Sequence, residues 1–295
     1  MTPVPRALIQ STGREIWKSR AVTPQIYQPA GVGLPCRDMR GVLPRHLLVL
    51  CPAFFLAGVL AVRFPETPGS GTASVISVAV IAAPAIAALF LRLGVRRAVI
   101  SLAGLSLFAF AVEITGVLTG FPYGEFSYGA GLGPKLAGLV PYALPVAYVP
   151  LVIGAVAAAE PRASDTPGRR AGWVFSAALL LVALDGVLDP GAVRLGLWVW
   201  PEGGAYYGVP VENYLGWALS GTLAAALLLA LGGWWRGTVP RPMLLDSALI
   251  SLAFWAAVTA AAGLPFPALL GGVLFILFLR RRAVLSRRWR KRWWR

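Results

Sequence analysis

Apolar residues gather along this chain into eight long runs, separated by short polar or proline-containing segments. The runs cover approximately residues 47–63, 73–91, 98–119, 141–159, 172–190, 213–233, 243–261 and 264–280. A helix that crosses a hydrocarbon core about 30 Å thick needs roughly 17 to 25 residues, and each run reaches or nearly reaches that length. The pattern therefore predicts an all-α, polytopic integral membrane helix bundle of about eight transmembrane helices, with seven as the alternative number.

The two ends of the chain differ from this central region. Residues 1–46 contain six prolines and scattered charges but no apolar run, so we expect a disordered cytoplasmic arm. This arm lacks the apolar core of a signal peptide, and Met39 is an alternative start to Met1. Residues 47–280 are expected to form the transmembrane helical domain. Residues 281–295 are expected to form a basic cytoplasmic tail that contains tryptophan.

Composition and charge support a membrane protein and give its orientation. Hydrophobic residues make up 57% of the chain and charged residues 13%, whereas an average soluble protein has about 25% charged residues. The net charge of +15 would suggest a nucleic-acid partner in a soluble protein. Here only Arg63, Lys135 and Arg194 fall on one face of the predicted topology, and the other 24 of 27 cations fall on the opposite face.

Lys and Arg are retained on the cytoplasmic side of a membrane protein. We therefore expect a multi-pass protein of the cell (plasma) membrane with both termini in the cytoplasm. The basic tail then lies against anionic lipid, and no nucleic acid is expected as a partner.

The residue inventory excludes several kinds of site. The chain has one histidine, His46, and two cysteines, Cys36 and Cys51. A histidine-based metal cluster, a four-cysteine zinc site, a Ser-His-Asp triad and a disulfide framework are therefore not expected. No metal site is predicted, and acid–base chemistry must rest mainly on carboxylates and tyrosines.

Three carboxylates lie within the apolar runs. Glu113 is in the third run, and Asp185 and Asp189 are near the end of the fifth. An ionised carboxylate at such a position is costly, so these residues usually face a bundle interior or a water-filled cavity and mark a functional site. Asp185 and Asp189 are four residues apart and would share one helix face. For Asp189, which precedes Pro190, the alternative is a position at the membrane interface where it caps a turn.

Two loops on the outer side follow these carboxylates, at residues 120–145 and 190–217. They are rich in Gly and Pro, and seven of the eight tyrosines lie between residues 123 and 214. An aromatic belt at the membrane interface would account for many of these rings. It would not account for the interleaved glycines and for Glu125, Glu212 and Asn213. Irregular backbone at membrane depth is tolerated where it lines a cavity, so the loops predict a lined cavity.

The motifs of this region resemble a known family. They are Glu113-Ile-Thr-Gly with a further glycine at 120, PYGEFSY, LGPKLAG, Asp185-x3-Asp189-Pro, WVW and YYGVPxxNYLGW. Over roughly residues 105–218 they resemble the signature blocks of the bacterial and archaeal carotenoid biosynthesis membrane family that includes the CruF-type carotenoid 1,2-hydratases. The resemblance implies a cofactor-independent hydro-lyase that adds water across the terminal C=C of a ψ end group, as in lycopene or γ-carotene. The implied partners are the carotenoid, water, the bilayer and other carotenoid enzymes.

Hydration of this double bond would proceed by protonation to a tertiary carbocation and attack by water. The proton donor must be a carboxyl group that apolar surroundings keep protonated, and a second carboxylate should orient the water. Asp185 or Glu113 is the expected acid, with Asp189 or Glu212 together with Asn213 handling water. Aromatic rings would stabilise the cation or grip the polyene. The expected substrate-binding residues are Tyr123, Glu125, Phe126, Tyr128, Trp198, Trp200, Tyr206, Tyr207, Tyr214 and Trp217.

Three other functions remain open at this stage. A membrane prenyltransferase would hold magnesium and a diphosphate with Asp-rich motifs, of which Asp185 to Asp189 resembles one half. A carotenoid cyclase would use the same protonation but trap the cation with an internal double bond. A lipid transporter would need acidic helices without catalysis.

Overall fold

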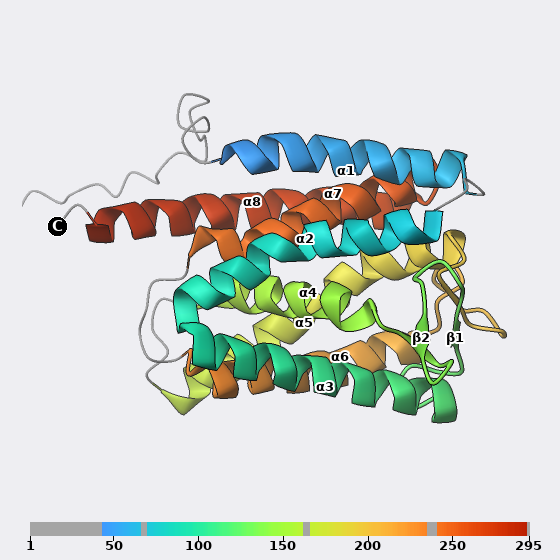
Figure 1. Cartoon of the computed structure of the whole chain (residues 1–295), viewed down its shortest axis with the longest axis horizontal. Helices are drawn as coiled ribbons and strands as arrows, with labels where there is room; N and C mark the ends of the chain where they lie inside the picture. Colours follow the sequence, from blue (N-terminus) through green and yellow to red (C-terminus); the bar gives the residue numbers. More distant parts are fainter. Residues whose placement is uncertain (1–42, 66–69, 162–165, 235–240, 294–295) are drawn as a thin grey trace, which may run out of the picture.

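The computed structural model describes residues 43–65, 70–161, 166–234 and 241–293. Most of the predicted N-terminal arm, including Met39, lies outside these residues. Within them the chain forms eight α-helices and four two-residue strands (Figure 1). The helices are α1 (Arg45–Arg63), α2 (Ser70–Leu93), α3 (Val95–Thr119), α4 (Leu144–Ala159), α5 (Pro167–Arg194), α6 (Val211–Gly232), α7 (Asp246–Ala261) and α8 (Pro265–Trp293), and a 3₁₀ turn, η2 (Pro242–Leu245), precedes α7.

Each of the eight apolar runs corresponds to one of these helices, which confirms the predicted all-α membrane bundle. Helices satisfy their own backbone hydrogen bonds, as a membrane-embedded segment must. Among the described residues, six helices are long and apolar enough to cross a membrane, and α4 is a shorter apolar helix. The eighth run forms the first half of α8, which continues as a helix through most of the basic tail.

The fifth run differs from its predicted end. We expected it to stop at residue 190, but α5 continues through Pro190 to Arg194. Proline removes one backbone hydrogen bond from a helix interior. The helix survives this loss because the segment around Pro190 is buried among neighbouring helices, and Gly191 lies directly against Trp255 of α7. Asp189 is therefore inside a helix and not at its end.

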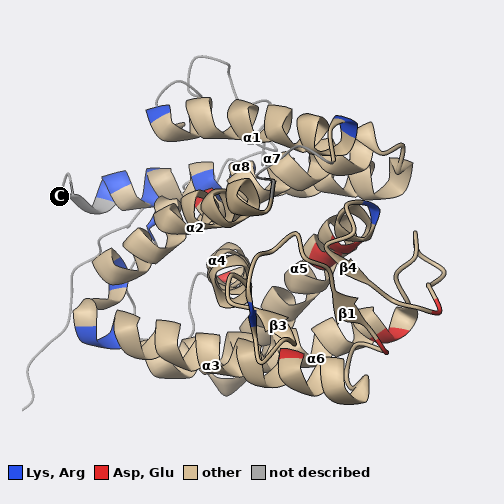
Figure 2. Cartoon of the chain, turned by 45° about the vertical axis from the view of Figure 1, so that its right-hand side comes forward, with Lys and Arg blue, Asp and Glu red and all other residues tan. Residues whose placement is uncertain are grey.

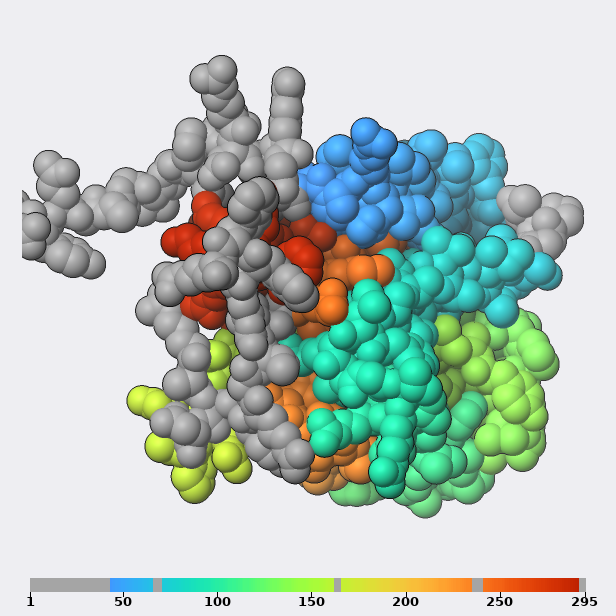
Figure 3. Space-filling view, turned by 60° about the vertical axis from the view of Figure 1, so that its left-hand side comes forward, coloured from blue at the N-terminus to red at the C-terminus, as the bar shows by residue number. Residues whose placement is uncertain are grey.

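Helix α7 is the centre of the bundle. It packs against α1, α2, α4, α5 and α8, and small residues allow close approach at several of these contacts. A Cβ atom on Gly58 of α1 would lie 2.5 Å from the backbone oxygen of Phe254, and one on Gly154 of α4 would lie 2.8 Å from the Cβ of Ala248. In Figure 3 the orange atoms of α7 are visible between α1, in blue, and α2, in cyan.

The two ends of the bundle have different chemistry. One end carries the segments 120–143 and 195–210, which contain all four strands: β1 (Ser127–Tyr128), β2 (Lys135–Leu136), β3 (Val140–Pro141) and β4 (Trp198–Val199). Strand β1 pairs with β4, and β2 pairs with β3, both antiparallel. Figure 2 shows most of the described Lys and Arg residues at the opposite end, near the C-terminus. The loop end is the one that the sequence assigns to the outside.

Candidate active site

The two predicted outer loops pack against each other and cover the ends of α3, α5 and α6. Their pairing places Tyr128 of the first loop beside Trp198 of the second. The indole Nε1 of Trp200 also donates a hydrogen bond of 3.0 Å to the backbone oxygen of Tyr123. Gly216 of α6 makes room for the first loop, because a Cβ there would lie 2.5 Å from the ring of Tyr123. The loops thus form a fixed cover, as their Gly and Pro content suggested.

A pair of buried aspartates lies beneath this cover. Asp185 and Asp189 of α5 are 2% and 3% exposed, and Asn213 in the first turn of α6 is 2% exposed. The Nδ2 atom of Asn213 donates a hydrogen bond of 2.9 Å to Oδ2 of Asp185 and a second one to Oδ2 of Asp189. The one-turn spacing of the aspartates thus brings both carboxyl groups to the same side-chain amide. In the described part of the chain, Oδ1 of Asp185 has no hydrogen-bond partner.

The third membrane carboxylate has a different partner. Glu113 of α3 is 5% exposed, and its Oε2 accepts a hydrogen bond of 2.7 Å from the hydroxyl of Tyr128. Burial, and then the nearby Glu113 carboxyl, raises the pKa of Tyr128 well above its ordinary value. The Tyr128 hydroxyl therefore stays protonated and remains a hydrogen-bond donor to Glu113.

Glu113, Asp189 and Asn213 face one cavity with a volume of about 550 Å³. Volumes of about 300 to 1,000 Å³ are typical of small-molecule sites. Aromatic side chains form much of its wall near the carboxylates, and their rings follow one another edge to face or tilted, with neighbouring centroids 5.4 to 6.4 Å apart. These rings belong to Trp198, Tyr128, Phe126, Trp200, Tyr123, Trp217 and Tyr148. No Lys, Arg or His side chain among the described residues lines the cavity.

The structure separates the sequence candidates into two groups. Those that line the cavity are Glu113, Asp189, Asn213, Tyr123, Phe126, Tyr128, Trp198, Trp200 and Trp217. Asp185 lies behind Asn213 and outside the lining, so it reaches the cavity only through its neighbours. Glu125 and Glu212 are exposed, and neither lines the cavity.

The remaining tyrosine candidates form a layer outside the aspartate pair. The Tyr206 ring packs against Tyr207 and Tyr214, with centroids 5.1 and 5.7 Å apart, and the Tyr206 hydroxyl donates a 3.3 Å hydrogen bond to the backbone oxygen of Gly186. None of these three residues lines the cavity. The three tyrosines cover α5 near Asp185. In this position they support the aspartate pair and do not contact a ligand in the cavity directly.

Several lining residues were missed by the sequence analysis. Tyr148 of α4 is one of them. Ser220 of α6 does not line the cavity, but it holds a lining residue in place because it accepts a 2.9 Å hydrogen bond from the Tyr123 hydroxyl. The larger omission is a second half of the cavity on α1, α2 and α7. Its lining residues are Ala57, Leu60, Ala61, Phe64, Ala73, Ser74, Ser77, Val78, Ile81, Ser247, Ser251, Phe254 and Trp255. The signal available for α2 was the helical spacing of its small residues on one face.

A buried carboxylate site under aromatic loops in a membrane bundle agrees with the family resemblance, and comparison with known proteins decides it. Residues 69–278 match the model of a family described as carotenoid biosynthesis protein. The chain belongs to this family. The matched segment includes all the carboxylates of the cavity and both outer loops, whereas α1 precedes it. The expected family membership is thereby confirmed.

One curated protein that is similar to this chain is bisanhydrobacterioruberin hydratase of Haloarcula japonica. It is 39% identical to this chain over 251 residues, which cover 82% of this chain and 76% of the relative. No solved structure matches the chain. The described residues contain no group of three or more His, Cys, Asp or Glu side chains arranged to hold a metal ion.

Proposed function

We propose that this member of the carotenoid biosynthesis family is a hydratase that adds water across the terminal C=C of a ψ end group in an acyclic carotenoid. The observation that carries the proposal is the placement of Glu113 and of the Asn213-linked aspartate pair at one apolar, aromatic-lined cavity inside a membrane bundle. The similar hydratase of Haloarcula japonica supports the same class of reaction.

The aspartate pair is the source of the proton. Two carboxylates that share one amide donor repel each other strongly when both are ionised, and none of the described residues that line this cavity is a cation that could offset the charge. The pair therefore retains one proton. Asp189 delivers it because Asp189, unlike Asp185, faces the cavity.

The reaction then balances with water alone. The Asp189 carboxyl gives its proton to the terminal double bond at the carbon that bears one hydrogen, and the positive charge develops on the tertiary carbon. A water oxygen bonds to this carbon, and Glu113, held in place by the Tyr128 hydroxyl, takes the released proton. The proton returns from Glu113 to the aspartate pair through solvent, and the product is a tertiary alcohol. The surrounding aromatic faces stabilise the cation by roughly 0.5 to 2 kcal/mol each.

The orientation and surroundings belong to the same proposal. With 24 of 27 cations on one face of the topology, the bundle lies in the plasma membrane with both termini in the cytoplasm and the carboxylates in the outer half. Its partners are the carotenoid, water, bilayer lipid and other carotenoid enzymes, and it needs no cofactor because the reaction transfers only protons and water. A prenyltransferase is disfavoured because the part of the chain that the structure describes places no basic side chain in the cavity lining to meet a diphosphate.

Expression of the chain in a lycopene-accumulating bacterial host tests this function. Chromatography and mass spectrometry of the pigments should show products heavier than lycopene by one or two molecules of water. Cells grown in ¹⁸O-labelled water should place the label in the new hydroxyl group. An isomer of lycopene would show a cyclase instead, and unchanged pigment beside well-expressed protein would overturn the proposal.

A further inference from the structure

The cavity extends from the carboxylates to a gap between two helices at the edge of the bundle. Its lining includes Ala57 and Ala61 of α1 and Ser74 and Ser77 of α2. These two helices both pack on α7, but they do not pack along each other in the part of the chain that the structure describes. The cavity thus lies between α1 and α2, with α7 as its floor.

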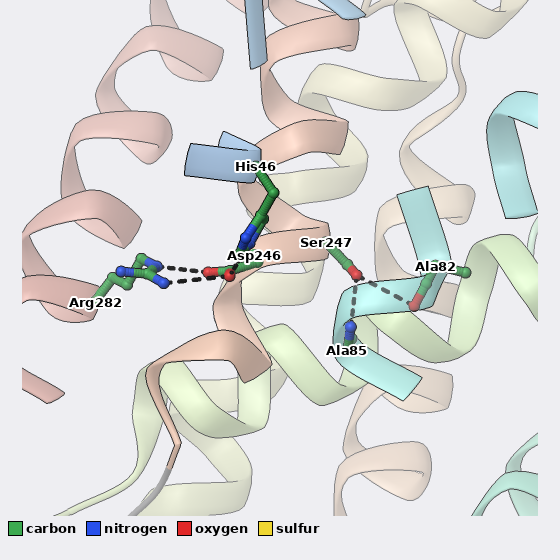
Figure 4. A network of polar contacts seen from close by, with 6 residues as sticks. All are labelled: His46, Ala82, Ala85, Asp246, Ser247 and Arg282. Atoms are coloured by element: carbon green, nitrogen blue, oxygen red, sulfur yellow. Dashed lines mark hydrogen bonds and ion pairs between the residues drawn. The ribbon is translucent and has the colours of Figure 1, made fainter. Parts of the chain in front are cut away.

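Two consecutive residues of α7 hold the two helices at the deep end of this gap (Figure 4). Asp246 is fully buried, and its carboxylate accepts a bond of 2.7 Å from the ring of His46 at the start of α1 and one of 2.5 Å from Nε of Arg282 in α8. Ser247 receives a 3.0 Å hydrogen bond from the backbone N–H of Ala85 and donates one of 3.3 Å to the oxygen of Ala82, both in α2.

Beyond these contacts α1 continues along α7, and among the described residues the cavity lies between α1 and α2. Gly58 lies so close to the backbone of Phe254 that a side chain at this position would not fit between α1 and α7. The rim of the opening is apolar and exposed: Leu60 is 45% and Phe64 63% exposed. No charged residue of α1 or α2 lines the cavity. In a membrane, exposed apolar side chains on a helix at the periphery of the bundle face lipid chains and not water.

The size of the cavity suits one end of a long apolar molecule. Its lining on α2 runs from Ala73 to Ile81, about 12 Å along the helix axis. A conjugated polyene is stiff and extended, so it cannot fold to fit wholly inside. The part that exceeds the cavity must leave in a nearly straight path, and the opening between α1 and α2 gives such a path into the bilayer.

From this geometry we infer that the gap between α1 and α2 is a lateral portal through which one end of an extended isoprenoid polyene enters from the membrane. The end group reaches the carboxylates while the rest of the chain remains in the portal and in lipid. This inference rests on the proposed hydratase function for the identity of the occupant. The portal itself rests on the cavity and its lining.

Bulky side chains in the portal test it. Ala57→Phe on α1 and Ser77→Phe on α2 would fill the opening, while Ala53→Phe and Ala79→Phe add the same ring to exposed positions of the same helices that do not line the cavity. Ala57→Leu and Ser77→Leu are milder forms in case the phenylalanine variants do not fold. Each protein is purified in mild detergent from the lycopene-producing host. Pigment bound per protein and hydrated product per cell are then measured.

The portal variants should lose about tenfold in both bound pigment and product, a loss that overpacking of the opening would cause. The two control variants should match the wild type. The inference is overturned if the well-folded portal variants bind and convert lycopene as the controls do. If the wild type binds pigment in a portal-dependent way but makes no hydrated product, the portal stands and the hydratase function fails.

Discussion

The hydroxyl of Tyr128 lies 2.7 Å from Oε2 of Glu113, so a residue of the first outer loop reaches down to the one carboxylate that α3 contributes to the cavity. Tyr128 also pairs with Trp198 of the second loop. The position of the Glu113 carboxyl is therefore linked to the joint between the two loops. A substitution at this joint should affect chemistry even where it leaves the bundle intact.

Removal of the Tyr128 hydroxyl tests this link. Tyr128→Phe keeps the ring and its packing but leaves Glu113 without its donor. We expect a loss of about 1 to 2 kcal/mol of transition-state stabilisation, or roughly five- to thirtyfold in kcat, with little change in bound pigment. Turnover of lycopene in membrane preparations measures kcat. Equal rates for Tyr128→Phe and the wild type would show that Glu113 does not depend on this bond.

The carboxylates that face the cavity should carry the reaction. Asp189→Asn and Glu113→Gln remove the proposed acid and base at almost constant size, and general acid–base catalysis contributes about 10²- to 10⁴-fold. We expect hydration to fall by at least the lower factor in each variant. Glu202→Gln, at an exposed position in the second loop, is the matched control and should retain wild-type activity. Full activity in both cavity variants would remove the carboxylates from the mechanism.

Asn213 should contribute to stability as well as to activity, because it satisfies two buried carboxyl groups at once. Asn213→Ala leaves both without their shared donor, which costs about 1 to 3 kcal/mol. Thermal melting in detergent should show this loss as a lower melting temperature. The double variant Asn213→Ala, Asp185→Ala should lose less than the sum of the two single losses because the residues are in contact. Strict additivity would show that the two side chains are energetically independent.

The ion pair at the deep end of the portal should be among the strongest single contributions to stability. Arg282 is 5% exposed and its partner Asp246 is fully buried, so Arg282→Leu would remove the cation from a buried carboxylate that then keeps only its contact with His46. Breaking a buried pair in this way costs about 3 to 5 kcal/mol. A melting curve should therefore shift strongly for Arg282→Leu and little for Arg280→Leu, an exposed position on the same helix. Similar shifts in both variants would contradict the role of the pair.

The sequence predicted the fold well because a membrane imposes its constraint on each helix separately. Every apolar run became a helix, and the costly carboxylates Glu113, Asp185 and Asp189 proved to be buried at one place. Which residue faces inward at a helix start was harder to predict. Glu212 and Asn213 are adjacent, but successive residues of a helix point about 100° apart, so Asn213 faces the aspartates while Glu212 is exposed.

The half of the cavity on α1, α2 and α7 could not be predicted from residue type. Residues such as Ala57, Ser77 and Ser251 line it because of how three helices diverge, and small side chains of this kind occur on many helix faces. The helical spacing of small residues on α2 was a partial signal, but it is the packing between helices that distinguishes a lining alanine from one that faces lipid. The carboxylates could be recognised in the sequence by their residue type, whereas the proposed portal can be recognised only from the arrangement of the helices.

A cavity that admits one end of a stiff molecule has a consequence for the order of products. In the proposed reaction, a carotenoid with two identical ψ ends could not present both ends to Asp189 in one binding event, so we expect the molecule to leave, turn round in the bilayer and bind again. If the proposed function and portal hold, we expect the singly hydrated carotenoid to be a free membrane pigment between the two reactions. Its lifetime, and its availability to other enzymes, depends on how quickly it finds the gap between α1 and α2 for the second time.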